Sequence, residues 1–584
     1  MKGFAHSVST AAFLGLVTLP QVTVTGQSWM QDPSANQGLV DGEGTKKQQS
    51  AATTAVLDGN DPQQRGLGET GYDDALDVQG SPKARAFNAL RRRKYWATTE
   101  FRASTTTCHA NNGDSSSASS FHKTLPHDEY GQVDPDAFEA LLECVAEGDF
   151  DKCEQVPAGD ESGFLIQPIG GNAVDFTGPA SSALTAPSAP ALNSEEVAAN
   201  MAELYWMALT RDVPFSKYGE NEDTVAAAEN LATMPGFAKM TGVAVGMDGK
   251  ADPQSQLFRS TAVGVETGPM ISQLLVKDFT LDSITVTPKM TTFVPGVDYM
   301  TDYDEWLHIQ NGGSPSVVPA EDSEKRYIRN ARDLSRLVVT DTIYTEMFRA
   351  ALILLGEGAI SKAGFNGPYA NSTRQKGFVS YGASHVMKIL GSAEVAQRSS
   401  WFQKWNVHMY ARPEAFAGTI HNVILGNIDV DVDASILGNT ELLERVASQN
   451  AIQNGQTGNP MPTYLLSQAT AGGSPSHPSY PAGHAVQNGA YATVLKALVG
   501  LERGGSCFSD PVFPDDEGLT LQPYTGDDCL TYEGEINKLA VNIAFGRAMD
   551  GVHWRFDSEE GLRLGETIGV RMLQEVNYTH TMLQ

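Results

Sequence analysis

Apolar residues recur along much of this chain at the spacing of three and four that is typical of amphipathic helices. One such run follows Asn193-Ser194-Glu195-Glu196, where a capping residue and acidic side chains mark a helix start. Further helices are expected over residues 329–358, 401–412, 483–501 and 535–549, with a last one beginning at Asp557. Strand-like runs are short, as at residues 283–286 and 423–425. The pattern predicts a mainly α-helical protein with one large helical-bundle domain and few short strands.

The N-terminal part of the chain has a different composition. A lysine near the start, a short apolar run and small residues after it predict a signal peptide over residues 1–26. Residues 27–83 are rich in Gln, Gly, Asp and Ser and lack apolar periodicity, which predicts a disordered or removed leader. We therefore expect a secreted protein, extracellular or in the cell wall, with a single domain over residues 84–584.

The charge of the chain limits its partners. It carries 70 acidic and 41 basic residues, and its net charge is −29 at pH 7. Electrostatic repulsion makes nucleic acids and anionic membranes poor partners. No stretch approaches the roughly 20 consecutive apolar residues that a membrane helix needs. In so acidic a protein, cations that gather at one place indicate a site for an anion.

The five cysteines are few for a secreted protein of 584 residues. Cys144 and Cys153 flank a polar turn, and Cys507 and Cys529 flank a loop. In an oxidising compartment these two local disulfides are the simplest pairing, which leaves Cys108 either free or bonded to a second subunit. The alternative is five reduced thiols.

The first group of candidate site residues precedes Pro413. If a helix ends there, Lys404, His408 and Arg412 differ by only about 80° over two turns and share one face. Cations at this spacing usually lie on a solvated surface, but the neighbouring aromatic residues, among them Trp401, indicate a buried helix. Buried cations need a partner anion.

The second group is Pro481-Ala482-Gly483-His484, directly before an expected helix. Glycine permits close approach of the backbone, and the first N–H groups of a helix have no intrahelical partners. This helix end can therefore hold an anion, and His484 can exchange protons with it. Taken alone, the tetrapeptide is a weak signal.

The third group follows the expected helix that ends near Arg547. Asp550-Gly551 breaks this helix, and His553 lies six residues after Arg547. An isolated histidine here is more often a helix cap than a ligand. Cations, imidazoles and bare backbone amides from three separate segments are together a stronger signal. Such a set suits a tetrahedral oxyanion, either phosphate or vanadate.

The spacing of these groups resembles that of the vanadium-dependent haloperoxidases, which share an active site with a class of acid phosphatases. The pattern is Lys-x7-Arg-Pro, then Pro-x-Gly-His, then Arg-x5-His. The seven residues between Lys404 and Arg412, and His477 ahead of the second group, are similar to the algal bromoperoxidase branch. Stretches outside the motif, such as residues 125–131, extend the resemblance over about residues 84–580. It implies the helical-bundle fold of the haloperoxidase and acid phosphatase superfamily.

The resemblance also implies roles for the candidate residues. His553 would be the one covalent protein ligand of vanadium, the Gly483 amide would donate to a vanadate oxygen, and His484 would be the acid–base group. Three cations would neutralise the vanadate oxygens: Lys404, Arg412 and Arg547.

Other positions carry less specific expectations. His477 is expected to influence halide preference, and Trp401 either walls the halide region or packs in the core. Asp341 is a candidate to orient a site histidine, and His408 is expected to support the site. Ala482 departs from the family pattern, which often has Ser there, and the lost hydroxyl donor is expected to weaken vanadate binding by about 1–3 kcal/mol.

The implied function is that of a vanadate-dependent bromoperoxidase without heme. It would oxidise bromide or iodide with hydrogen peroxide to a hypohalous-acid equivalent, which halogenates an organic acceptor. A homo-oligomer, dimer or larger, is expected. The alternatives are a secreted acid phosphatase, with His553 as nucleophile, and a non-catalytic oxyanion-binding protein. The natural acceptor, the halide preference, the oligomer size and any structural calcium stay open.

Overall fold

The structure is a computed structural model that describes residues 119–580 apart from short gaps. These gaps are residues 174, 176–177, 247–249, 253–255, 282, 340–342, 361–368, 370–371, 457 and 501–503. All described residues belong to one compact unit, Gly80–Gln584. The predicted signal peptide, the predicted leader, Cys108 and Asp341 lie outside the described residues.

Helices make up most of the regular structure, as predicted. The helices before residue 330 are α4 (Pro135–Glu147), α5 (Phe150–Cys153), η3 (Gly170–Asn172), α6 (Glu195–Leu209), η4 (Phe215–Lys217), α7 (Glu222–Thr233), η5 (Phe237–Lys239), α8 (Gln273–Val276) and α9 (Tyr303–Gln310). Those that follow are α10 (Ala331–Val338), α11 (Thr345–Gly356), α12 (Ala383–Ser392), α13 (Val395–Phe402), η7 (Gln403–His408), α14 (Pro413–Ile424), α15 (Ala434–Leu437), α16 (Thr440–Gln456), α17 (Gly483–Val499), α19 (Tyr532–Asp550) and α20 (Arg555–His580).

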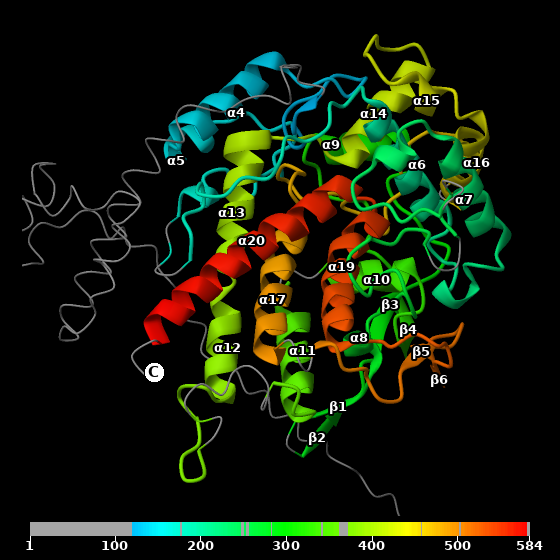
Figure 1. The fold of residues 1–584 in the computed structure, drawn as a ribbon. Coiled ribbons are helices and arrows are strands. Elements are labelled where there is room, and N and C mark those ends of the chain that lie inside the picture. Colours follow the sequence, from blue (N-terminus) through cyan, green and yellow to red (C-terminus); the bar gives the residue numbers. More distant parts are fainter. Residues whose placement is uncertain are drawn as a thin grey trace, which may run out of the picture. The chain divides into compact units, whose positions relative to one another are not determined.

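The bundle at the centre of the described fold is built around α17. This helix packs against α20, α19 and α13, and Figure 1 shows α20 running diagonally across α17. Glycines permit the close approach of α17 and α20, because a Cβ on Gly565 would lie only 2.0 Å from the carbonyl oxygen of Val486. At Gly489 a Cβ would lie 2.3 Å from the carbonyl oxygen of Leu562. The packing brings the N-terminus of α17 next to the turn that precedes α20.

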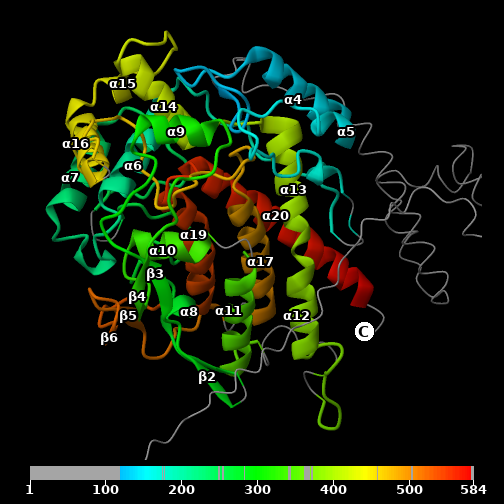
Figure 2. The ribbon, with the colours of Figure 1, turned by 180° about the vertical axis from the view of Figure 1, so that it is seen from behind.

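Local sequence explains where the main helices begin and end. The side chain of Ser194 caps α6, and that of Thr531 caps α19. Gly551 ends α19 in the left-handed conformation, with a φ of 99°. Helix α20 begins at Arg555, two residues before the predicted start at Asp557. The view from behind in Figure 2 shows α10 beside α19, on the side of the bundle away from α12 and α13.

Two of the predicted helices are wrong in their extent. Residues 329–358 do not form one helix but two, α10 and α11, on either side of an undescribed stretch. Residues 401–412 do not form one helix either. There α13 passes into the π-helical segment η7, and Met409 then adopts a left-handed conformation with a φ of 45°. Pro413 begins α14 instead of ending a helix, because proline is favoured at the first helical position.

Strands are few and short. Three antiparallel pairs occur: β1 (Phe279–Leu281) with β2 (Ile284–Val286), β3 (Met290–Phe293) with β4 (Glu321–Arg326), and β5 (Val512–Pro514) with β6 (Leu521–Pro523). The strand predicted at residues 283–286 is confirmed, whereas residues 423–425 are the end of α14. Within the described residues, no helix has the length and apolar character needed to cross a membrane.

Both predicted disulfides are confirmed. Cys144 at the end of α4 is bonded to Cys153 in α5, and Cys507 is bonded to Cys529. Each disulfide closes a short segment next to a helix, since their sequence separations are 9 and 22 residues.

Candidate active site

The three predicted groups of residues meet at one cavity of about 310 Å³. The lining residues that can take part in chemistry are Trp401 from α13, His477 from the loop before α17, Gly483 (through its backbone) and His484 from α17, Arg547 from α19, and His553 from the turn before α20. Lys404 and Arg412 lie behind this lining, where they bind the loop 477–479. Segments far apart in the sequence therefore converge as the motif predicts.

His553 lies between a carboxylate and a guanidinium. Its Nδ1 is 2.7 Å from Oδ2 of Asp557, and its Nε2 is 3.0 Å from Nη1 of Arg412. Nδ1 therefore donates to the carboxylate, while the Nε2 lone pair accepts from the guanidinium. Burial lowers the pKa of His553 well below its ordinary value, and the positive charge of Arg412 lowers it further. The imidazole is neutral and directs its Nε2 lone pair toward the cations, which is the state that a metal ligand requires.

Asp557 holds His553 in this orientation. It lies in the first turn of α20 and also accepts hydrogen bonds from the backbone N–H of Trp554, at 3.1 Å, and from the Ser479 hydroxyl. Burial raises the pKa of Asp557 to about 6, against the opposing effect of the Ser479 hydrogen bond. Sequence reasoning treated Asp557 only as a helix start and missed this role. The spacing of four between a histidine and an acid at a helix N-terminus was the available signal.

Lys404 and Arg412 are buried cations bound to carbonyl oxygens. The Nζ of Lys404 donates to two carbonyls of the loop 477–479, at 2.7 and 2.6 Å. Arg412 donates from Nε to the His477 carbonyl, at 3.0 Å, and from Nη1 to the Val552 carbonyl, at 2.8 Å. In the described part of the chain, neither cation forms an ion pair with a carboxylate. Burial lowers the pKa of Arg412 to about 9, and burial and Arg412 lower the pKa of Lys404.

Arg547 differs from the other two cations because it has a carboxylate partner. Its Nη1 lies 3.1 Å from Oδ2 of Asp550, one turn later in α19. The same nitrogen donates to the Val338 carbonyl of α10, at 3.3 Å. Burial raises the pKa of Asp550, although Arg547 opposes this effect. Asp550 is the second carboxylate that sequence reasoning missed, since it was read only as part of a helix break.

The N-terminus of α17 faces the same cavity. Ala482 is the N-cap residue and offers no side-chain hydrogen bond. Gly483 and His484 follow in the first turn, where backbone N–H groups have no intrahelical partner. The Nε2 of His484 is buried and has no hydrogen-bond partner among the described residues. Burial, and then Arg547, lower the pKa of His484 well below its ordinary value, so the ring is neutral and can accept a proton.

His477 and Trp401 form another part of the cavity wall. Their ring centroids are 4.7 Å apart, and Nη2 of Arg412 lies 3.1 Å from Nδ1 of His477. The indole Nε1 of Trp401 is buried and has no hydrogen-bond partner in the described part of the protein. Both residues therefore line the cavity at the site.

His408 is not part of the cavity lining. Its ring packs edge-on against Tyr480, with 4.6 Å between the centroids. The prediction that His408 shares a helical face with Lys404 and Arg412 is wrong, because the π-helical segment ends at His408 and Met409 turns the chain. Burial lowers the pKa of His408 to about 4.

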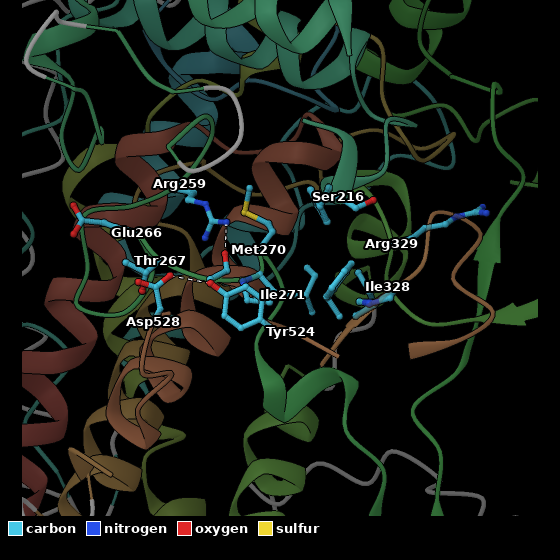
Figure 3. A pocket seen from close by; sticks show the side chains of 15 residues that line it. Ser216, Arg259, Glu266, Thr267, Met270, Ile271, Ile328, Arg329, Tyr524 and Asp528 are labelled. Carbon is cyan, nitrogen blue, oxygen red and sulfur yellow. Dashed lines mark hydrogen bonds between the residues drawn. The ribbon is translucent and has the colours of Figure 1, made fainter. Parts of the chain in front are cut away.

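A larger cavity, of about 470 Å³, lies elsewhere and has no lining residue in common with the site. Figure 3 shows its side chains, with Tyr524 beside Asp528. Arg259 is buried there, but it donates to the carbonyls of Val265 and Gly268 and so holds a loop in place. The described lining of this cavity also contains the carboxylates of Glu266 and Asp528 and no histidine, so it is a weaker candidate for anion chemistry than the site of His553.

The site is suited to a tetrahedral oxyanion. The guanidinium of Arg412 and the ammonium of Lys404 have carbonyls as hydrogen-bond partners, and the nearby Asp557 carboxylate offsets their positive charge only in part. An imidazole lone pair on His553 and an orphaned ring nitrogen on His484 lie in the same enclosed region. Buried charge of this kind is stabilised by an anion. Vanadate fits the donor set because one imidazole and several N–H donors suffice to hold it.

Comparisons with known proteins agree with this chemistry. Residues 447–581 match the family model described as the VCPO second helical-bundle domain. The chain is 57% identical over 506 residues to the vanadium-dependent bromoperoxidase of Ascophyllum nodosum, covering 86% of this chain and 90% of that protein. It is 32% identical over 543 residues to the vanadium-dependent bromoperoxidase of Corallina pilulifera, covering 80% of this chain and 89% of that protein.

A solved structure gives the same result for the fold. The homohexameric structure of the second vanadate-dependent bromoperoxidase of Ascophyllum nodosum aligns with a TM-score of 0.77 at 42% sequence identity. The alignment covers 85% of this chain and 86% of that one. The chain belongs to the vanadium-dependent bromoperoxidase family.

Proposed function

We propose that this protein oxidises bromide, and also iodide, with hydrogen peroxide to a hypohalous-acid equivalent that halogenates an organic acceptor. The observation that carries the proposal is the state of His553, whose Nδ1 is bound by Asp557 and whose Nε2 lone pair faces Arg412. The similarity to bromoperoxidases over most of the chain supports the same activity.

Vanadate is the proposed cofactor. His553 would ligate it through Nε2, the Gly483 amide would donate to it, and three cations would neutralise its oxygens: Lys404, Arg412 and Arg547. When bound, vanadate supplies Lewis-acid activation of hydrogen peroxide without a change in oxidation state.

The acid–base work belongs to His484. Its neutral ring lines the cavity, and its buried Nε2 has no competing partner in the described residues. His484 takes up the proton that hydrogen peroxide releases, and it returns a proton when water leaves. Overall, bromide, hydrogen peroxide and one proton yield hypobromous acid and water. Lys404 holds positive charge where negative charge develops on oxygen.

His477 and Trp401 are the proposed walls of the halide region. Their rings are in contact within the cavity, and Arg412 lies beside His477. The positive charge of Arg412 attracts a halide, and the aromatic wall limits the water around that halide. We assign halide preference to His477 on this basis.

Two properties of the whole protein follow from related observations. The homohexameric relative supports assembly of this chain into a homo-oligomer. The signal peptide predicted over residues 1–26 supports secretion to the extracellular space or cell wall.

A titration tests the proposed function. Orthovanadate is added to the apoprotein, and peroxide-dependent bromination of a phenol dye is measured. Activity is expected to rise with vanadate to saturation and to be absent in His553→Ala. Phosphatase activity is measured in parallel, because the same cations would hold a phosphate group. Phosphate ester hydrolysis without vanadate-dependent bromination would overturn the proposal.

A further inference from the structure

An apolar groove lies directly beside the active-site cavity. Its volume is about 480 Å³, and Gln167 and Gly170 line both the groove and the cavity. The other cavity described above has no lining residue in common with either. A molecule in this groove would therefore be next to the cavity that contains His553 and His484.

The layer of chain formed by residues 163–170 contributes to the lining of both the groove and the cavity. The backbone N–H of Ile166 donates to the Ser476 carbonyl at 2.9 Å, which anchors the layer to the loop that carries His477. At Gly170 a Cβ would lie 3.0 Å from Cδ1 of Trp401, so the layer packs closely on the cavity wall. The segment that lines the groove is therefore in direct contact with the loop of His477 and with Trp401.

The lining of the groove is mostly apolar and partly exposed. Phe150 and Phe164, which line it, are 64% and 67% exposed. Further apolar lining residues are Leu125, Val156, Leu165 and Ile169. Several of these pack on a small hydrophobic cluster that includes Trp401 and Trp405, on either side of Lys404 in the sequence. Exposed aromatic side chains that line one groove mark a surface that binds apolar molecules.

Charge selects among such molecules. The charged residue in the lining of the groove is Glu154, and the described lining contains no lysine or arginine. The protein as a whole has a net charge of −29. An organic anion would be repelled here, whereas a neutral aromatic ring would bury its apolar surface without penalty.

The geometry points to this groove as the binding site of a neutral, electron-rich aromatic acceptor, such as a protonated phenol. This inference rests on the proposed function, because hypobromous acid must form in the neighbouring cavity. The ring carbon then forms the C–Br bond and loses its proton, and the oxygen of hypobromous acid leaves as water. Halogenation would occur in part on a bound acceptor and not only in solution.

Paired substitutions test the groove. Phe164→Ser and Phe150→Ser are compared with Phe378→Ser, a control at a phenylalanine that is 76% exposed and does not line the groove. The KM for phenol is expected to rise about twofold to tenfold in the two groove variants and to be unchanged in the control. Peroxide-dependent iodide oxidation without organic acceptor is expected to be unchanged in all three. An unchanged KM for phenol in both groove variants would overturn the inference.

A binding measurement separates this inference from the proposed function. The neutral dye N-phenyl-1-naphthylamine is titrated into the protein, and its fluorescence is followed as phenol or benzoate is added. Phenol is expected to displace the dye and benzoate is not, and Phe164→Ser is expected to weaken dye binding. Absence of dye binding, or dye displacement by benzoate equal to that by phenol, would overturn the proposal that the groove binds a neutral aromatic acceptor. Absence of iodide oxidation in the unaltered protein would overturn the proposed function. The dye titration would still show whether the groove binds a neutral aromatic molecule.

Discussion

Two groups of buried arginines in this protein have opposite environments. Arg332 binds Oδ1 of Asp212 at 2.6 Å and Oδ1 of Asp298 at 2.8 Å. Arg412 at the site is equally buried, at 1% exposure, but it donates to the carbonyls of His477 and Val552. Burial opposes the charge of both. The two carboxylates outweigh burial and raise the pKa of Arg332, whereas the pKa of Arg412 falls to about 9.

The difference shows which cations serve structure and which serve binding. The carboxylates around Arg332 neutralise its positive charge. Arg211 belongs to the same ion-pair network, because it pairs with Asp298 at 2.5 Å. Arg412 donates to backbone carbonyls and forms no ion pair among the described residues, and the nearby Asp557 carboxylate, which holds His553, offsets its positive charge only in part. A bound oxyanion would supply to Arg412 the compensating negative charge that Asp212 and Asp298 supply to Arg332.

The largest expected effect comes from removing the imidazole that faces Arg412. His553→Ala should lower vanadate affinity and bromide oxidation by more than about 100-fold, because even the residues that orient a metal ligand contribute 10–100-fold. Equilibrium dialysis of vanadate and the bromination assay measure both. Retention of vanadate-dependent activity in this variant would show that another residue is the ligand.

Paired arginine substitutions test the comparison itself. Arg332→Met should lower the free energy of unfolding by about 3–5 kcal/mol, since it leaves buried carboxylates without their cation. Arg412→Met should lower the free energy of unfolding by only about 1–2 kcal/mol, because two carbonyls lose a hydrogen-bond donor. The same substitution should remove most vanadate binding. Urea denaturation and dialysis separate the two effects. Equal losses of stability in the two variants would refute the distinction.

Substitution of Asp557 removes the partner of His553. Asp557→Asn should reduce vanadate affinity by about 10–100-fold, because the amide no longer holds the imidazole with Nδ1 protonated. Calorimetric titration of vanadate measures this. As a control, Asp341→Asn changes the carboxylate that the family resemblance assigned to a site histidine. A larger loss in Asp341→Asn than in Asp557→Asn would give the orienting role to Asp341.

A smaller change is expected when a donor is added at the N-terminus of α17. Ala482→Ser introduces a hydroxyl at the N-cap and should tighten vanadate binding by about 1–3 kcal/mol. The added hydroxyl should also cap the helix, so thermal stability of the apoprotein is expected to rise slightly. A looser or unchanged vanadate titration would contradict the first expectation.

A further effect concerns a buried histidine away from the site. Burial lowers the pKa of His408 to about 4, below its ordinary value near 6.5. The unfolded chain therefore binds more protons between these values, so stability rises with pH in this window and is lost as pH falls. His408→Gln should reduce the slope of unfolding free energy against pH by at most about 1.4 kcal/mol per unit. An unchanged slope in denaturation series from pH 4 to 6.5 would contradict this.

The local sequence predicted the helices better than their connections. Ser194 and the acids after it begin α6, and the apolar run after Gly483 forms α17, as expected. Pro413 was misplaced because proline is compatible with both the end of one helix and the first position of the next. The left-handed Met409 that separates the two helices has no signal in the residue type.

The site residues show the same division. Lys404, Arg412 and His553 were found from motif spacing, since spacing along the chain preserves a family pattern. Asp557 was missed as the partner of His553, because a sequence does not indicate which of several acids reaches an imidazole. Only the position of Asp557 in the first turn of α20 brings its carboxylate to 2.7 Å from Nδ1.

The sequence by itself determined that the protein is helical, that it gathers cations for an anion, and that it resembles a bromoperoxidase. These properties depend on residue type and short-range spacing. The tertiary structure decided that Lys404 and Arg412 bind backbone carbonyls while Arg332 binds carboxylates, and that an apolar groove adjoins the cavity. Such properties depend on long-range packing, above all the close contact of α17 and α20 at their glycines, which residue order alone does not specify.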